Sequence, residues 1–188
     1  MTTAAASGDG AANAVTFIRG TTATTMLWPE SSIPSTFTVC SVTRFTGGTR
    51  ARILGAHSSP TQPALWAHGH WSGNRGIVYY DGWKASSSSK GVLDDWLVMC
   101  GTNAAGVPAP GNIILDQDEI GTATGGVGNV RLNIGYQYQS DWALHSLLIW
   151  DYSLGTVPAL WHTSATLSQV LLLWLFSWCD SGMRGRAG

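Results

Sequence analysis

The residues best suited to chemistry are aromatic and polar side chains beside two tight turns near the middle of the chain. They are Trp71, Asn74, Arg75, Tyr80, Asp81 and Trp83. Flat aromatic rings can stack on the apolar face of a sugar, while amide, guanidinium and carboxylate groups can satisfy its hydroxyls. This mixture predicts a carbohydrate-binding site on a rim of loops. The alternative is that the aromatic rings only close one end of the fold.

The acidic residues do not suggest glycoside hydrolysis. A retaining glycosidase places two carboxylates about 5–5.5 Å apart across one bond. The chain has only two glutamates, Glu30 and Glu119, in different segments. Asp116 and Asp118 are closer together, but they fall in an expected hairpin turn, where acidic residues usually serve turn geometry. We predict no catalytic residue and no enzyme, and we retain a degenerate or cryptic glycoside hydrolase as the alternative.

Metal ligation has two weak candidates in the sequence. His68 and His70 would share one face of a strand, but no third ligand stands near them, so two polar groups on a half-exposed strand are favoured. Five acids could supply oxygen ligands to Ca²⁺: Asp81, Asp116, Asp118, Asp141 and Asp151. A turn-forming role is favoured for Asp81 and Asp116. Ca²⁺ stays open as a cofactor, and no other is implied.

The composition indicates an all-β protein and excludes some partners. Hydrophobic residues make up 44% and charged residues 11%, with 23 glycines, as in short strands joined by tight turns. The net charge is −1 and the Lys and Arg residues are scattered, so nucleic acid is not an expected partner. Cys40 and Cys100 each lie in an apolar run, where buried thiols are favoured over a disulfide, and Cys179 leaves the count odd.

Turn-forming residues divide the chain at short intervals into runs rich in β-branched and aromatic residues. Expected strands span residues 14–20, 24–28, 37–45, 50–56, 65–71, 76–83, 93–100, 112–115, 119–123, 130–135 and 142–151. The strand at 37–45 should place Phe37, Val39 and Phe45 on one face. Gly47-Gly48 and Gly73-Asn74 are expected turns.

Several short segments follow one another in an order typical of one family. They are Ile113-Ile114-Leu115-Asp116, Glu119-Ile120-Gly121, Leu132-Asn133-Ile134-Gly135 and Ser140-Asp141-Trp142-Ala143, leading to Leu148-Ile149-Trp150-Asp151. Over roughly residues 14–154 the chain resembles the concanavalin A-like and laminin G-like jelly-roll domains. The chain departs from the pattern at Gln117, where the family usually has glycine, and after Leu154.

The resemblance implies both an architecture and a role. The architecture is an all-β, antiparallel, two-sheet jelly-roll sandwich. The role is a non-catalytic binding or adhesion module for a glycan or glycoprotein, at an extracellular or cell-surface location and as a part of a larger multidomain protein. The same fold also hosts hydrolases, so the fold alone cannot choose between binding and catalysis.

The expected organisation is a flexible segment at residues 1–13, the sandwich at 14–154 and an atypical C-terminal extension at 155–188. Residues 170–179 are the most apolar run, but a transmembrane helix needs about 20 apolar residues, so no transmembrane span is predicted.

Removing the residues after Leu154 should leave a soluble β-rich domain, because the family-like strands end there. Circular dichroism and thermal melting of the truncated chain check this expectation. Loss of the β-type spectrum and of cooperative melting would make the C-terminal apolar run an integral part of the core.

Overall fold

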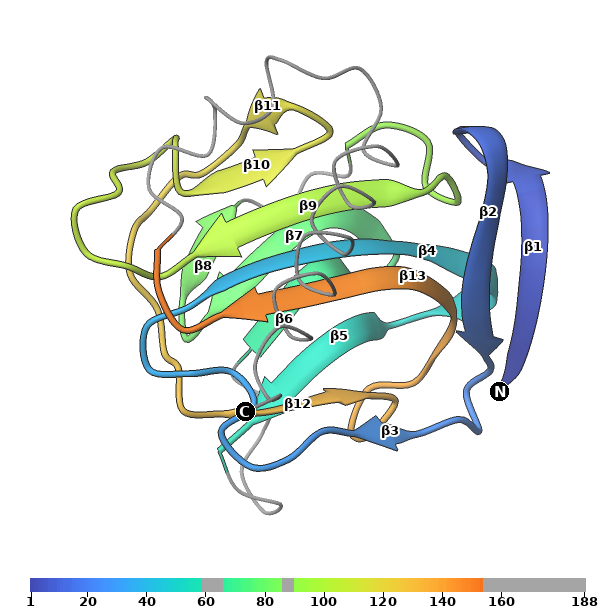
Figure 1. Ribbon diagram of the computed structural model, residues 1–188, viewed down its shortest axis with the longest axis horizontal. Coiled ribbons are helices and arrows are strands. Elements are labelled where there is room, and N and C mark those ends of the chain that lie inside the picture. The colour runs from blue at the N-terminus through green and yellow to red at the C-terminus, as the bar shows by residue number, and fades with distance from the viewer. Residues whose placement is uncertain (59–65, 86–89, 154–188) are drawn as a thin grey trace, which may run out of the picture. The chain divides into compact units, whose positions relative to one another are not determined.

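The computed structural model describes residues 1–58, 66–85 and 90–153, and within these ranges the chain contains strands and no helix. The strands form two antiparallel sheets, so the predicted all-β sandwich is confirmed. In Figure 1, β4, β9 and β13 lie in front of β5, β6 and β7. These strands belong to the compact unit Met1–Gly155.

One sheet has seven strands. In spatial order they are β1 (Thr2–Gly8), β2 (Ala11–Gly20), β13 (Ser140–Trp150), β4 (Thr38–Arg50), β9 (Leu97–Thr102), β10 (Ile113–Leu115) and β11 (Asp118–Glu119). The other sheet has six strands: β3 (Met26–Leu27), β12 (Arg131–Ile134), β5 (Arg52–His57), β6 (Trp66–Trp71), β7 (Asn74–Tyr80) and β8 (Trp83–Ala85).

The main core lies between the sheets and follows the period-two alternation of strands. On β4, Val39 and Phe45 point into this core together with the preceding Phe37, as predicted. Val42 points to the other face, where it joins a smaller cluster with Phe17 of β2 and Trp96. The β1–β2 hairpin therefore supplies a second, smaller apolar contact.

The N-terminal residues differ from the sequence-based expectation. Residues 1–13 were expected to be a flexible segment, but β1 and the start of β2 lie there, paired from Thr2 opposite Arg19 to Ala6 opposite Val15. This hairpin was not predicted because its side chains are small or polar. Most of its residues are exposed, so they show no apolar alternation. The expected C-terminal extension at 155–188, with its apolar run, lies outside the described residues.

The expected turn at Gly47-Gly48 is wrong, because β4 continues to Arg50. A Cβ atom on Gly47 would lie 2.6 Å from a carboxylate oxygen of Asp141, and the amide of Thr49 donates to that carboxylate at 3.1 Å. Glycine at this position makes room for Asp141 within an extended strand.

The favoured reading of Cys40 and Cys100 as separate thiols is also wrong. The two residues face each other on the paired strands β4 and β9 and form a disulfide. They are sixty positions apart in the sequence, so their proximity depends on which strands pair.

Two hairpin turns use non-glycine residues in the left-handed region. The β6–β7 turn consists of Ser72 (φ 51°) and Gly73 (φ 74°), one position before the expected Gly73-Asn74 pair. The β10–β11 turn consists of Asp116 (φ 45°) and Gln117 (φ 83°), so Gln117 adopts a left-handed conformation without being glycine. A two-residue turn with positive φ at both positions matches the twist of the strands it joins.

No helix within the described ranges is long and apolar enough to cross a membrane.

Replacing Cys40 and Cys100 together by Ala should lower the free energy of unfolding. In the chain-entropy model a loop of this length contributes roughly 4 kcal/mol. Denaturant unfolding of the parent and variant chains measures the difference. Reductant should destabilise the parent and leave the variant unchanged; equal unfolding midpoints of parent and variant would contradict the stabilising role of the disulfide.

Candidate functional site

The six residues of the predicted site do not form one rim. Trp71 and Asn74 flank the turn at one end of β7, whereas Tyr80 and Asp81 lie at its other end. β7 has seven residues, so its two ends are roughly 20 Å apart at about 3.3 Å per residue. The structure brings Trp71 and Trp83 together. It separates both of them from Arg75 and Tyr80, which face the core.

Arg75 and Tyr80 lie between the sheets and not on the surface. The guanidinium of Arg75 is 4% exposed and donates to Asp116 at 2.8 Å and to the carbonyl of Lys90 at 2.6 Å. Tyr80 is fully buried against Phe37 and Trp66. Neither side chain can meet a ligand at the surface.

Asn74 and Asp81 serve their turns. The side-chain amide of Asn74 donates to the carbonyl of Ser72 at 3.1 Å, within the β6–β7 turn. Asp81 is exposed and has a φ of 51° in the β7–β8 turn. Asp81 is therefore the predicted polar residue whose side chain stays open to solvent beside Trp83.

Stacked side chains cover the outer face of the six-stranded sheet. Val78 and Tyr80 point into the core, so Tyr79 between them points outward, where it makes edge contacts with Trp71 and Trp83. The indoles of Trp71 and Trp83 are stacked with ring centroids 5.1 Å apart.

Arg52 extends this stack on the other side of Trp71. Its guanidinium lies 4.2 Å from the ring of Trp71 and 4.2 Å from the ring of Tyr138. β5 and β8 lie on opposite sides of β6, so Arg52 and Trp83 approach Trp71 from strands on opposite sides. We call the stacked side chains of Tyr138, Arg52, Trp71 and Trp83, in this spatial order, the aromatic column.

The ends of the aromatic column are exposed, Trp71 is half-buried and Arg52 is buried. Trp83 is 45% exposed and Tyr138 is 39% exposed, whereas Arg52 is 2% exposed. Burial lowers the pKa of Arg52 to about 10, an effect that the nearby Tyr138 and Tyr79 oppose. Arg52 therefore remains a cation at neutral pH, held between two rings by cation–π attraction.

Sequence reasoning missed Arg52, Tyr79 and Tyr138. Tyr79 was missed because the candidates were chosen for their nearness to the two turns, which selected Tyr80 beside Asp81-Gly82. The usable signal was the period-two alternation of a strand, which places Tyr79 on the opposite face from Val78 and Tyr80. Arg52 and Tyr138 come from β5 and from the segment after β12, and no spacing in the sequence links them to Trp71.

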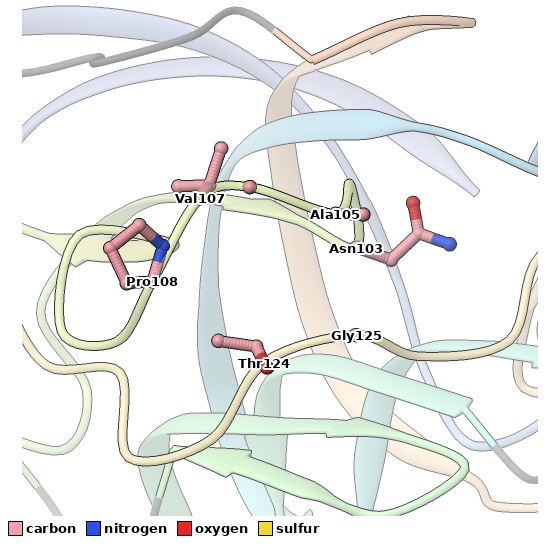
Figure 2. Close-up of a pocket in the computed structure, with 7 residues that line it drawn as sticks. Asn103, Ala105, Val107, Pro108, Thr124 and Gly125 are labelled. Carbon is pink, nitrogen blue, oxygen red and sulfur yellow. The ribbon is translucent and has the colours of Figure 1, made fainter.

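A pocket of about 550 Å³ opens at the loop rim near β8. Its lining residues are Asn103, Ala105, Gly106, Val107, Pro108, Thr124 and Gly125. Figure 2 shows Val107 and Pro108 on one loop and Thr124 and Gly125 on the other. The side-chain amide of Asn103 bonds the backbone of Phe37 and Gly126, and Lys84 Nζ donates to the carbonyl of Thr124 at 2.8 Å. These bonds hold both loops in place.

His68 and His70 share one face of β6, as predicted, but that face is the core and not a half-exposed surface. Nδ1 of His68 is 2.7 Å from the hydroxyl of Tyr80, and Nε2 is 3.3 Å from the carbonyl of Met99. Nδ1 of His70 is 3.3 Å from the hydroxyl of Thr43. Burial lowers the pKa of His68 to about 4 and that of His70 to about 3, and it raises the pKa of Tyr80.

The acids considered for Ca²⁺ have separate roles where the structure shows them. Asp116 accepts from Arg75 and, at 3.0 Å, from the amide of Val98. Asp141 accepts from the amide of Thr49. Residues 1–58, 66–85 and 90–153 contain no group of three or more His, Cys, Asp or Glu side chains that could hold a metal ion.

Stability should fall in acid because of His68 and His70. The pKa values of both imidazoles in the folded protein lie below 6.5, so in acid the unfolded chain binds protons more readily than the folded chain does. Stability should be fully present above about pH 7 and decrease between pH 6.5 and about pH 4, by about 3 kcal/mol for each histidine. Urea unfolding at a series of pH values measures this decrease.

Variants assign the pH dependence to these residues. Changing His68→Gln or His70→Gln should reduce the slope of stability against pH. The control His145→Gln removes an exposed imidazole on β13 and should keep the parent slope. An unchanged slope in the His68 and His70 variants would contradict the assignment.

No known family model matches this chain, and no curated protein sequence matches it.

Proposed function

We propose that this chain is a non-catalytic binding or adhesion module that recognises carbohydrate on the free face of Trp83. One observation carries the proposal: Trp83 ends the aromatic column, and its indole is held by Trp71 and Tyr79 while it stays 45% exposed. A single exposed apolar side chain needs no explanation, but a large ring held in one orientation by other rings is a ready stacking surface.

A pyranose would bury its apolar face on this indole. The ring of Trp83 is already ordered by its neighbours, so little side-chain entropy would be lost on binding. Asp81 lies two positions before Trp83 in an exposed turn, and its carboxylate can accept bonds from sugar hydroxyls. The ligand is accordingly a glycan or the glycan of a glycoprotein.

The concanavalin A-like and laminin G-like resemblance agrees with this proposal through the two-sheet architecture. Because such a sandwich can carry either binding or hydrolysis, the argument rests on Trp83 and not on the fold. A small exposed site has little surface with which to offset the cost of ordering a ligand, so we expect micromolar to millimolar dissociation constants.

Trp83→Ala should weaken glycan binding by about tenfold, equivalent to about 1.4 kcal/mol, and lower stability by less than about 1 kcal/mol. Trp71→Ala should instead cost about 3 kcal/mol of stability, because it opens the aromatic column over Arg52. Titration calorimetry and denaturant unfolding of the same variants separate the two effects.

Tyr152→Ala is the matched control, because Tyr152 is another exposed aromatic residue, at 49%, beyond the end of β13. It should change neither binding nor stability. If Trp83→Ala strongly destabilised the fold and left the affinity per folded molecule unchanged, the ring would be structural and the site would lie elsewhere.

A hydrolysis assay on the same polysaccharides that bind on a glycan array distinguishes binding from catalysis. We expect binding without turnover. Turnover that is lost in Asp118→Asn would overturn the proposal in favour of a glycoside hydrolase.

A further inference from the structure

Three of the four edge strands of the two sheets are short or charged. β3 has two residues, β8 has three, one of them Lys84, and β11 consists of the acids Asp118 and Glu119. The amide of Thr122 also donates to the carbonyl of Lys84, so the edge of β8 is partly covered. Short length and charge both discourage another chain from adding a strand, so these three edges are protected against pairing.

The fourth edge strand, β1, lacks these protections. It has seven residues, Thr2–Gly8, and none of them is charged or proline. Its pairing with β2 is regular from Thr2 to Ala6, and a bulge follows between Ala6 and Gly8. β1 ends the seven-stranded sheet, with β2 on one side and no strand of the described ranges on the other (Figure 1). Alternate backbone N–H and C=O groups of β1 therefore point away from β2, toward the open edge.

Small side chains leave the open edge of β1 accessible. Six of its seven residues are exposed, and all seven are Thr, Ala, Ser or Gly. A peptide from another protein that adds a strand is selected through pockets for its alternate side chains, and side chains this small cannot build such pockets. The strand that matches β1 in length, and that brings no bulky or charged side chain, is β1 of a second copy.

We propose that β1 is a self-association edge, at which two copies of the chain pair antiparallel and join their seven-stranded sheets into one. A two-fold axis at the centre of the strand places each β1 against the same strand of the other copy. Both open edges are used in this pair, and the other edges are protected, so association stops at two copies. The inference goes beyond the proposed carbohydrate binding and does not depend on it.

The position of Arg19 favours the antiparallel orientation. Arg19 lies opposite Thr2 on β2, and its guanidinium donates to the Thr2 hydroxyl at 3.2 Å. In an antiparallel pair centred on Ala5, Thr2 of one copy faces Gly8 of the other, so the two Arg19 residues are roughly 20 Å apart along the strands. This separation exceeds the Debye length of about 8 Å in physiological salt. A parallel pair would instead place both cations at the same level.

The length of the edge sets the expected strength of the pair. Seven residues at about 3.3 Å each give an edge roughly 23 Å long. One strand contact of this length buries less than the roughly 800 Å² per partner of a stable interface. We therefore expect a reversible dimer with a dissociation constant of about 0.1–1 mM.

Sedimentation equilibrium of the full chain measures the association from about 10 μM to about 1 mM. Every chain carries Cys179→Ser, because the third cysteine could otherwise join two copies through a disulfide. The average mass should rise with concentration from that of one chain toward that of two. Over the same range, the amides of β1 that point to the open edge should exchange hydrogen severalfold more slowly as the concentration increases.

Ala5→Lys places like charges from the two copies at the centre of the pair and should raise the dissociation constant about fivefold. Ala6→Lys, on the other face of β1, should act in the same way. Thr16→Lys is the matched control, because Thr16 is exposed and pairs with Ala5 but lies on β2, one strand inside the edge. It adds the same charge and should keep the parent dissociation constant. Thermal melting of each variant confirms that it is folded.

The outcomes separate this inference from the proposed function. The mass of a single chain throughout the concentration range would overturn the inference, as would a dimer that both Ala5→Lys and Ala6→Lys leave unchanged. Growth beyond two copies would overturn the closed two-fold pair. Absence of glycan binding in chains that still pair through β1 would overturn the proposed function and leave this inference in place.

Discussion

The buried guanidinium of Arg52 is the constraint on which the outer face of the six-stranded sheet depends. A cation that is 2% exposed needs compensation for lost hydration, and Arg52 obtains it from the carbonyl of Trp66 at 3.1 Å and from the faces of Trp71 and Tyr138. Trp71 is thereby contacted by both Arg52 and Trp83. The most exposed rings of the column are those at its two ends, Trp83 and Tyr138.

On the core-facing side of the same strands, the side chains pack around Tyr80. Its hydroxyl bonds His68, and a Cβ atom on Gly101 of β9 would lie 2.5 Å from that hydroxyl. Glycine at this position lets the phenol reach across from one sheet to the other. With Tyr80 held in the core, Tyr79 must face outward, so the core and the aromatic column depend on the same strand register.

The loop rim is ordered by side chains that bond the backbone. Asn103 bonds Phe37 and Gly126, Lys84 bonds Thr124, and Asn112 donates to the carbonyl of Ala123 at 2.8 Å. Loops held in this way present a preformed surface, which reduces the entropy lost when a ligand binds. The rim thus joins β8, at the edge of one sheet, to the loop between β9 and β10 of the other sheet.

The sequence by itself determined the all-β class, most strand positions and the outward or inward face of β4, because alternation and turn residues act over a few neighbouring positions. It also grouped Trp71 and Trp83, whose rings are in contact. Only the tertiary structure decided that Cys40 meets Cys100, that Tyr79 replaces Tyr80 on the outer face, and that Arg52 and Tyr138 complete the column. Each of these contacts depends on strand pairing and register between distant segments. The spacing of residues within one segment does not specify either.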